Sequence, residues 1–173
     1  MKATLLDHAD RRTLFSITET CLRFASIINL KKADHKAVLS DKKSKQRYLD
    51  YAFKRGLKEA MKCMVARGSI FFDAPAEFDI ILDERTTATN GKYNLADSIL
   101  YEMRGEIQSM QALRTFGPAL PATRKVTVRY GNSEKEPLLR AADVLANRIL
   151  HECRHGDVLS LMDQNNLFIL NLP

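Results

Sequence analysis

The chain has 173 residues, of which 45% are hydrophobic and 28% charged, and its formal net charge is +6. This length fits one domain with a substantial hydrophobic core, and the composition is that of a folded globular protein rather than a disordered one. The sequence has no run of about 18 consecutive apolar residues, so a transmembrane helix is excluded and no membrane partner is expected.

The N-terminal residues and the cysteines bear on the cellular compartment. Charged residues appear too soon after Met1 for a signal peptide. The three cysteines, Cys21, Cys63 and Cys153, are far apart and form no C-x-x-C pair, which argues against a disulfide framework and a cysteine zinc site. We therefore expect a cytoplasmic protein.

Hydrophobic periodicity predicts three elements in the first part of the chain. Residues 5–19 are expected to form a short helix, and the apolar run 22–30 a strand. After a polar loop over 31–44, apolar positions with the helical period predict a helix from about 45 to 67, which Gly68 ends.

The second half of the chain continues this alternation. We expect a buried strand over 78–82, an amphipathic helix over 94–113, a strand over 125–130 and a helix over 137–155. Residues 167–172 are expected to form a final strand or helix. Strands that alternate with helices predict an α/β fold.

The domain organisation follows from the same elements. We expect a single α/β domain over residues 1–173, with an N-terminal helical segment at 1–20 and a C-terminal appendage at 157–173.

Basic residues are concentrated between Lys31 and Arg67. This segment has twelve basic and four acidic residues, a balance of +8, which leaves −2 for the rest of the chain out of the total of +6. Such a region is typical of proteins that bind the phosphate backbone of nucleic acids, and the excess of lysine favours backbone contact over base reading. The alternative is a solvated helix face. The candidate nucleic-acid contacts are Lys42, Lys43, Lys45, Arg47, Lys54 and Arg55.

Two carboxylates flanked by apolar residues form a candidate metal site. Asp83 follows the predicted strand 78–82, and Asp143 lies in the predicted helix 137–155. Carboxylates from separate elements can hold Mg²⁺ while substrate phosphates complete its coordination, and metals held in this way drive phosphodiester hydrolysis. The alternatives are a turn residue for Asp83 and a solvated helix face for Asp143.

A polar stripe is expected on the same helix as Asp143. Asn147 and His151 follow Asp143 at intervals of four residues, with Arg140 nearby, so all four share roughly one face. This stripe faces either a site or water.

The segment His151-Glu152-Cys153-Arg154-His155 matches the H-E-x-x-H pattern of zinc hydrolases. The pattern puts two histidines on one helix face with a glutamate as base. Against it stand the charged Arg154, the lack of an obvious third ligand and the helix stop at Gly156. The alternative is a pair of surface histidines at a helix C-terminus, where positive charge is favourable.

Two motifs and their order resemble a domain-of-unknown-function family numbered 3800, which has an RNase H-like fold. The first is Ile80-Ile81-Leu82-Asp83-Glu84-Arg85. The second is Tyr130-Gly131-Asn132-Ser133 followed by Leu138-Leu139-Arg140-Ala141-Ala142-Asp143 and Val144 to Asn147. The strand, basic loop and Tyr-Leu-Asp-Tyr-Ala helix over 24–64 also resemble the family, so that the resemblance covers roughly 23–161.

The resemblance implies an RNase H-like mixed sheet flanked by helices and metal-dependent phosphodiester chemistry. It implies that Asp83 and Asp143 are the metal ligands. On this basis we expect the ion to be Mg²⁺ or Mn²⁺, Glu84 to be a further catalytic group that either binds the ion or supports its ligands, and Arg140 to contact a phosphate. The chain departs from the family pattern at its start, because no strand with Asp-Glu-Ser precedes Leu22. It also has Asn132 and Arg140 where the family usually has Asp and Gln.

The sequence therefore leaves several functions open. The leading hypothesis is a nucleic-acid-binding protein with metal-dependent nuclease activity. The second is a catalytically degenerate binding or assembly module, since a missing strand would expose a sheet edge to a second copy or a partner chain. The third is a zinc hydrolase that uses His151, Glu152 and His155.

Overall fold

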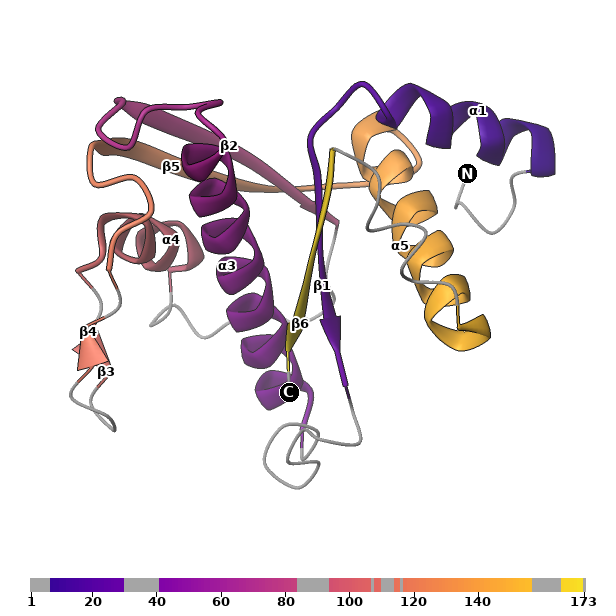
Figure 1. Ribbon diagram of the computed structural model, residues 1–173. Helices are drawn as coiled ribbons and strands as arrows, with labels where there is room; N and C mark the ends of the chain where they lie inside the picture. The colour runs from indigo at the N-terminus through magenta and orange to yellow at the C-terminus, as the bar shows by residue number, and fades with distance from the viewer. Residues whose placement is uncertain are drawn as a thin grey trace. The chain divides into compact units, whose positions relative to one another are not determined.

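The computed structural model describes residues 7–29, 41–83, 94–106, 108–109, 114–115, 117–156 and 166–172. Helices and strands both occur along these ranges and alternate except between residues 108 and 131, where three strands follow one another (Figure 1). This mixture confirms the predicted α/β class. The contacts divide the chain into two compact units, described separately below. The first unit consists of Met1–Ala25, Ile81–Arg85 and Tyr130–Ile169, and the second of Ser26–Ile80, Thr86–Arg129 and Leu170–Pro173.

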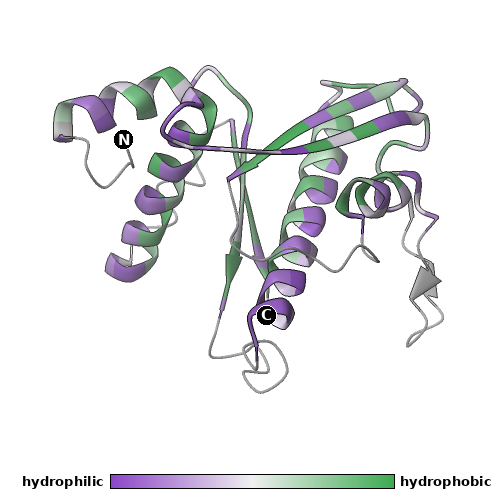
Figure 2. Ribbon diagram, turned by 180° about the vertical axis from the view of Figure 1, so that it is seen from behind, coloured by the Kyte–Doolittle hydropathy of each residue, from purple (hydrophilic) through white to green (hydrophobic). Residues whose placement is uncertain are grey.

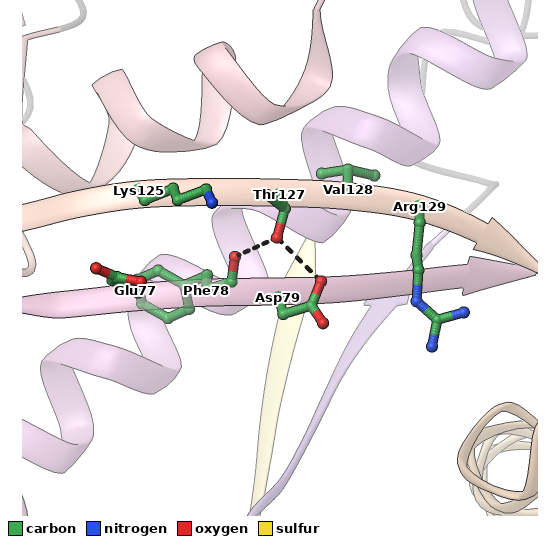
Figure 3. A pocket seen from close by; sticks show the side chains of 7 residues that line it. All are labelled: Glu77, Phe78, Asp79, Lys125, Thr127, Val128 and Arg129. Carbon is green, nitrogen blue, oxygen red and sulfur yellow. Dashed lines mark hydrogen bonds between the residues drawn. The ribbon is translucent and has the colours of Figure 1, made fainter.

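The long strands form two parallel pairs. β1 (Arg23–Ile28) pairs with β6 (Leu167–Leu172), and β2 (Ala76–Asp83) pairs with β5 (Thr123–Gly131). Arg23 N donates to Asn166 O at 2.7 Å, and Asn29 N donates to Leu172 O at 3.2 Å. The donor and the acceptor are the same number of residues apart in both bonds, so β1 and β6 run parallel. Figure 3 shows the arrows of β2 and β5 pointing the same way.

The elements of the first part of the chain follow the prediction closely. α1 (His8–Thr18) precedes β1, and α3 (Lys42–Ala66) follows it. α3 begins three residues before the expected start because Asp41 caps it: the Asp41 carboxylate accepts hydrogen bonds from the backbone N–H groups of Lys43 and Ser44 at 2.7 and 2.9 Å. At the other end Gly68 is left-handed, with φ 71°, as expected of a residue that ends a helix.

The predicted helix over 94–113 is wrong beyond Arg104. α4 spans Leu95–Arg104, and short strands β3 (Gln108–Ser109) and β4 (Arg114–Thr115) pair antiparallel after it. Gly105 stops the helix because it adopts φ 73°, a conformation that side chains disfavour. A Cβ atom at Gly105 would also lie 2.7 Å from the nitrogen of Pro118, so a residue with a side chain does not fit at this position.

The segment 117–122 closes the C-terminal end of α4. The buried residues Ala119 and Leu120 donate their N–H groups to Met103 O at 2.9 and 3.1 Å. The Arg104 guanidinium donates to Thr123 O at 2.8 Å. These bonds satisfy helix-end groups that lack intrahelical partners and attach the start of β5 to α4.

The core of the second unit lies between α3 and α4. Its buried apolar residues include Ala52, Leu57, Ala60, Leu95, Ile99 and Met103. An ion pair is buried among them: Lys58 Nζ lies 3.2 Å from Glu102 Oε1, and Lys58 is completely buried. Arg55 Nη1 contacts the same oxygen at 3.3 Å, so one carboxylate of α4 binds two cations of α3.

In the first unit, α1 packs against α5 (Pro137–His155). α5 buries Ala141, Val144, Leu145 and Ile149 on one face. The Arg23 guanidinium lies 5.3 Å from the centre of the Phe15 ring, a cation–π contact between the start of β1 and α1. Asn166 Nδ2 donates to Glu19 O at 3.0 Å and connects the start of β6 to the segment after α1.

The C-terminal segment contributes to a sheet. Residues 167–172 form strand β6, which settles the strand-or-helix alternative in favour of a strand. This strand falls in the segment 157–173 that the sequence analysis treats as an appendage, and it pairs with β1. The expectation of a single domain stays a prediction.

Glu102→Ala tests the buried ion pair. Removal of this carboxylate takes away an anion that contacts the buried Lys58 amine, so we expect the free energy of unfolding to fall by about 3–5 kcal/mol in urea denaturation. The control Glu59→Ala breaks more exposed pairs with Arg55 and Lys62 and should cost less than about 1 kcal/mol. The apolar pair Lys58→Met with Glu102→Leu should recover most of the stability. An equal loss of unfolding free energy in Glu102→Ala and Glu59→Ala would show that burial does not strengthen the ion pair between Lys58 and Glu102.

Candidate nucleic-acid interface and carboxylate site

The start of α3 carries the exposed part of the predicted basic region. Lys42, Lys43, Lys45 and Arg47 are all exposed, and none makes an ion pair with another residue of the described ranges. Figure 2 shows these first turns of α3 in the purple of hydrophilic residues. The part of the basic region over 30–40 lies outside the described residues.

One face of this helix combines positive charge with an aromatic ring. Lys43, Arg47 and Tyr51 are four residues apart and therefore share a face of α3. The Tyr51 side chain is 48% exposed, and its ring centre lies 6.2 Å from that of Tyr48. The sequence analysis did not identify Tyr51 as a candidate, although its spacing from Arg47 is visible in the sequence.

The later basic residues of α3 serve the fold instead. Lys54 Nζ donates to Ser98 Oγ at 2.6 Å, and Arg55 contacts both Glu102 and Glu59, at 3.3 and 3.4 Å. Lys54 and Arg55 were predicted to bind nucleic acid, but the structure engages them in contacts within the second unit. The described part of the predicted basic region thus has exposed cations at the start of α3 and, further along the helix, cations that contact other residues of the second unit.

Arg140 also has a structural task. Its Nη2 donates to Glu134 O at 2.7 Å and its Nε to Ser133 O at 3.4 Å. The guanidinium thereby binds two carbonyls of the turn that leads into α5. These contacts occupy part of the group that was expected to contact phosphate.

The two candidate metal ligands belong to the first unit, and both are exposed. Asp83 is the last residue of β2, and Asp143 lies on the solvent side of α5. Asn147 Nδ2 donates to Asp143 O at 2.9 Å and to its Oδ1 at 3.4 Å, so part of the polar stripe bonds to the helix itself. Glu84, the third predicted catalytic residue, lies outside the described residues.

Carboxylate oxygens are the donor type that Mg²⁺ and Mn²⁺ prefer, so Asp83 and Asp143 fit such an ion chemically as two of its ligands. Over the ranges that the structure describes, no three histidine, cysteine, aspartate or glutamate side chains form a group able to hold a metal ion. Further ligands would therefore come from water, from substrate phosphates or from residues outside those ranges.

The glutamate of the H-E-x-x-H pattern is turned away from the surface. Glu152 is 6% exposed, and its Oε1 lies 2.6 Å from Arg148 Nη2. His151 and His155 are exposed on α5. A buried carboxylate in an ion pair is poorly suited to act as the base of a zinc hydrolase, and the arrangement favours surface histidines.

A cavity of about 440 Å³ lies on the charged face of the β2–β5 pair (Figure 3). The charged and polar side chains that line it come from alternate strand positions, and Figure 2 shows the alternation of hydropathy along both strands. Thr127 Oγ1 lies 2.9 Å from Asp79 Oδ1 and 3.2 Å from Phe78 O, and its single hydroxyl hydrogen is shared between these two acceptors. The other lining residues are Glu77, Lys125, Val128 and Arg129. The sequence analysis gave this face no role, and its mixed charge favours neither anions nor cations.

Comparison of the chain with protein-family models, curated proteins and solved structures gives no match in any of the three. None of the helices described here is long and apolar enough to span a membrane.

Proposed function

We propose that this protein binds nucleic acid through Lys42, Lys43, Lys45 and Arg47 at the start of α3. The observation that supports this most is the sign of the charge at this helix end. The N-terminus of a helix carries partial positive charge, which favours acidic side chains in the first turn and disfavours basic ones. After its Asp41 cap, α3 begins with two lysines and has no acidic residue in its first turn.

This arrangement lowers the stability of the helix end and raises its positive potential. Local rules of stability are most often broken where function requires it. Because the Asp41 carboxylate already accepts from the backbone N–H groups of this helix end, a phosphate would be held by the basic side chains, and the helix dipole adds to their positive potential. Three of the four cations are lysines, which act as point charges and favour contacts to the backbone over reading of bases.

Tyr51 favours a single-stranded substrate. An exposed aromatic ring beside a basic track is the arrangement on which unpaired bases stack, whereas the bases of a duplex are already stacked. Lys43 and Arg47 lie on the same face and can hold the phosphates of a strand whose base stacks on Tyr51.

We propose nuclease activity as a second function of an RNase H-like domain. Its support is the exposure of Asp83 and Asp143, the resemblance of their motifs to family 3800, and the α/β alternation with α5 following β5. Mg²⁺ or Mn²⁺ held by these carboxylates would supply an activated water for phosphodiester hydrolysis.

The competing proposal is an assembly module without catalysis. Its support is that β1–β6 and β2–β5 are each two-stranded within the described chain, so each strand has an edge that no other described strand covers. Such edges favour pairing with a second copy or a partner chain.

Neutral substitutions at the start of α3 test the binding proposal. Lys43→Gln with Arg47→Gln should weaken binding of a labelled single-stranded oligonucleotide in fluorescence anisotropy. The slope of log affinity against log salt should fall by about 0.7 for each phosphate that the variant no longer neutralises. The matched control is Arg124→Gln with Lys125→Gln, which removes the same charge from exposed positions on β5. Equal weakening in both double variants would place the interface elsewhere.

Tyr51→Ala tests the preference for single strands. We expect the affinity for a single strand to fall by about 1–3 kcal/mol, the usual contribution of one stacked base. The affinity for a duplex of the same sequence should not change. Tyr51→Phe keeps the ring and should bind like the wild type. Weaker binding by Tyr51→Phe as well would indicate that the hydroxyl group, and not stacking, holds the strand.

A nuclease assay separates the catalytic proposal from the assembly module. Labelled single- and double-stranded DNA, RNA and RNA–DNA hybrid are incubated with Mg²⁺, Mn²⁺ or EDTA. Asp83→Asn and Asp143→Asn should each reduce cutting by more than the ~10–100-fold typical of removing a group behind a metal ligand. Asp73→Asn, an exposed carboxylate outside the site, should leave cutting unchanged. Binding without metal-dependent cutting would favour the assembly module.

A further inference from the structure

The C-terminal turn of α5 carries a histidine pair for which the proposed function has no use. His151 and His155 are one turn apart and exposed, and their ring centres lie 4.3 Å apart with an angle of 39° between the ring planes. The helix ends directly after them at Gly156, whose φ is 90° and whose N–H donates to Glu152 O at 2.9 Å. The two imidazoles therefore lie side by side on an ordered helix end.

Glu152 lies behind this pair. Its Oε1, held by Arg148 at 2.6 Å, is 3.8 Å from His151 Nδ1. That distance is too long for a hydrogen bond, but it puts a negative charge on the Nδ1 side of the ring. Because Arg148 pairs with this carboxylate, Glu152 does not bond to His151 and is poorly placed to activate water.

We propose that His151 and His155 form a two-histidine site for a divalent transition-metal ion of the Zn²⁺, Ni²⁺ and Cu²⁺ class. Imidazole nitrogens suit these ions, whereas Mg²⁺ and Ca²⁺ prefer oxygen ligands. Two imidazoles fill half of a tetrahedral shell, and water or a further ligand completes it. A cation is also favoured here because the C-terminal end of a helix carries partial negative charge.

The site differs in chemistry from the carboxylate pair. Asp83 and Asp143 offer oxygen ligands for Mg²⁺ or Mn²⁺, and the histidines offer nitrogen ligands for softer ions. The proposal does not depend on nucleic-acid binding or on nuclease activity. It assigns the H-E-x-x-H segment a binding role without hydrolysis.

Metal binding at this pair is coupled to the helix end. One ion can bridge His151 and His155 only while the last turn of α5 is helical, because only then do residues four apart face the same way. An ion that binds the folded form and not the unfolded one raises the apparent stability. Metal binding at this site can thus be measured as an increase in stability, without any enzymatic activity.

Calorimetric titration with Ni²⁺ and with Zn²⁺ tests the proposal. We expect one Ni²⁺ or Zn²⁺ ion to bind at the histidine pair, and an excess of Mg²⁺, which prefers oxygen ligands, should not displace it. His151→Ala and His155→Ala should each weaken binding by at least about tenfold, the lower limit for removing a group that merely supports a metal ligand. The chain has four histidines, so His8→Ala with His35→Ala is a matched control that removes two imidazoles elsewhere and should bind normally.

Two further measurements make the test decisive. Cys153 is exposed and lies between the two histidines in sequence, so Cys153→Ser should retain binding if the site consists of imidazoles. Zn²⁺ should raise the thermal midpoint of the wild type but not of His155→Ala, and circular dichroism of the metal-free proteins should be alike. Normal binding by His151→Ala, loss of binding in Cys153→Ser, or equal weakening in the His8 and His35 control would overturn the proposal.

Discussion

The buried contact between Lys58 and Glu102 constrains the whole second unit. Charges that are removed from water are tolerated only when they are paired, so α3 and α4 can pack only in the register that brings this amine and carboxylate together. Gly105 ends α4 shortly after Glu102, and the chain returns past Gly105 at Pro118 before β5 begins. Because Arg55 binds the same carboxylate, the middle of α3 serves the packing against α4, whereas the cations in its first turns are exposed.

Much of the fold could be predicted because its signals are local. The apolar period of α5, its Pro137 start and its Gly156 stop are adjacent in sequence, and α5 spans the residues expected of it. The end of α4 was missed because apolar residues continue with helical spacing to Leu113, whereas the feature that decides it is a close approach of Gly105 to Pro118. The start of α3 was missed although the Asp41 cap is a local signal.

The roles of charged residues were harder to predict for a physical reason. Lys43 and Lys58 have the same chemistry and lie on the same helix, yet one is exposed and the other completely buried. The difference depends on Glu102, which is 44 residues from Lys58 in sequence. The Arg140 guanidinium likewise donates hydrogen bonds to backbone carbonyls of a neighbouring turn. Composition therefore indicated a helix rich in cations but not which of these cations are exposed. Nucleic-acid binding, the RNase H-like architecture and the metal chemistry of Asp83 and Asp143 remain proposals.

The pairing of β1 with β6 has a consequence for how the chain acquires its structure. These are the first and last strands of the described chain, and their parallel hydrogen bonds join residues at opposite ends of the sequence. Closing such a long loop costs conformational entropy before any contact compensates for it, so this pairing forms slowly compared with the helices. During synthesis β1 leaves the ribosome long before its partner strand exists. Until then its edge is open, and the nascent chain depends on prompt completion or on a chaperone to avoid pairing with the wrong strand.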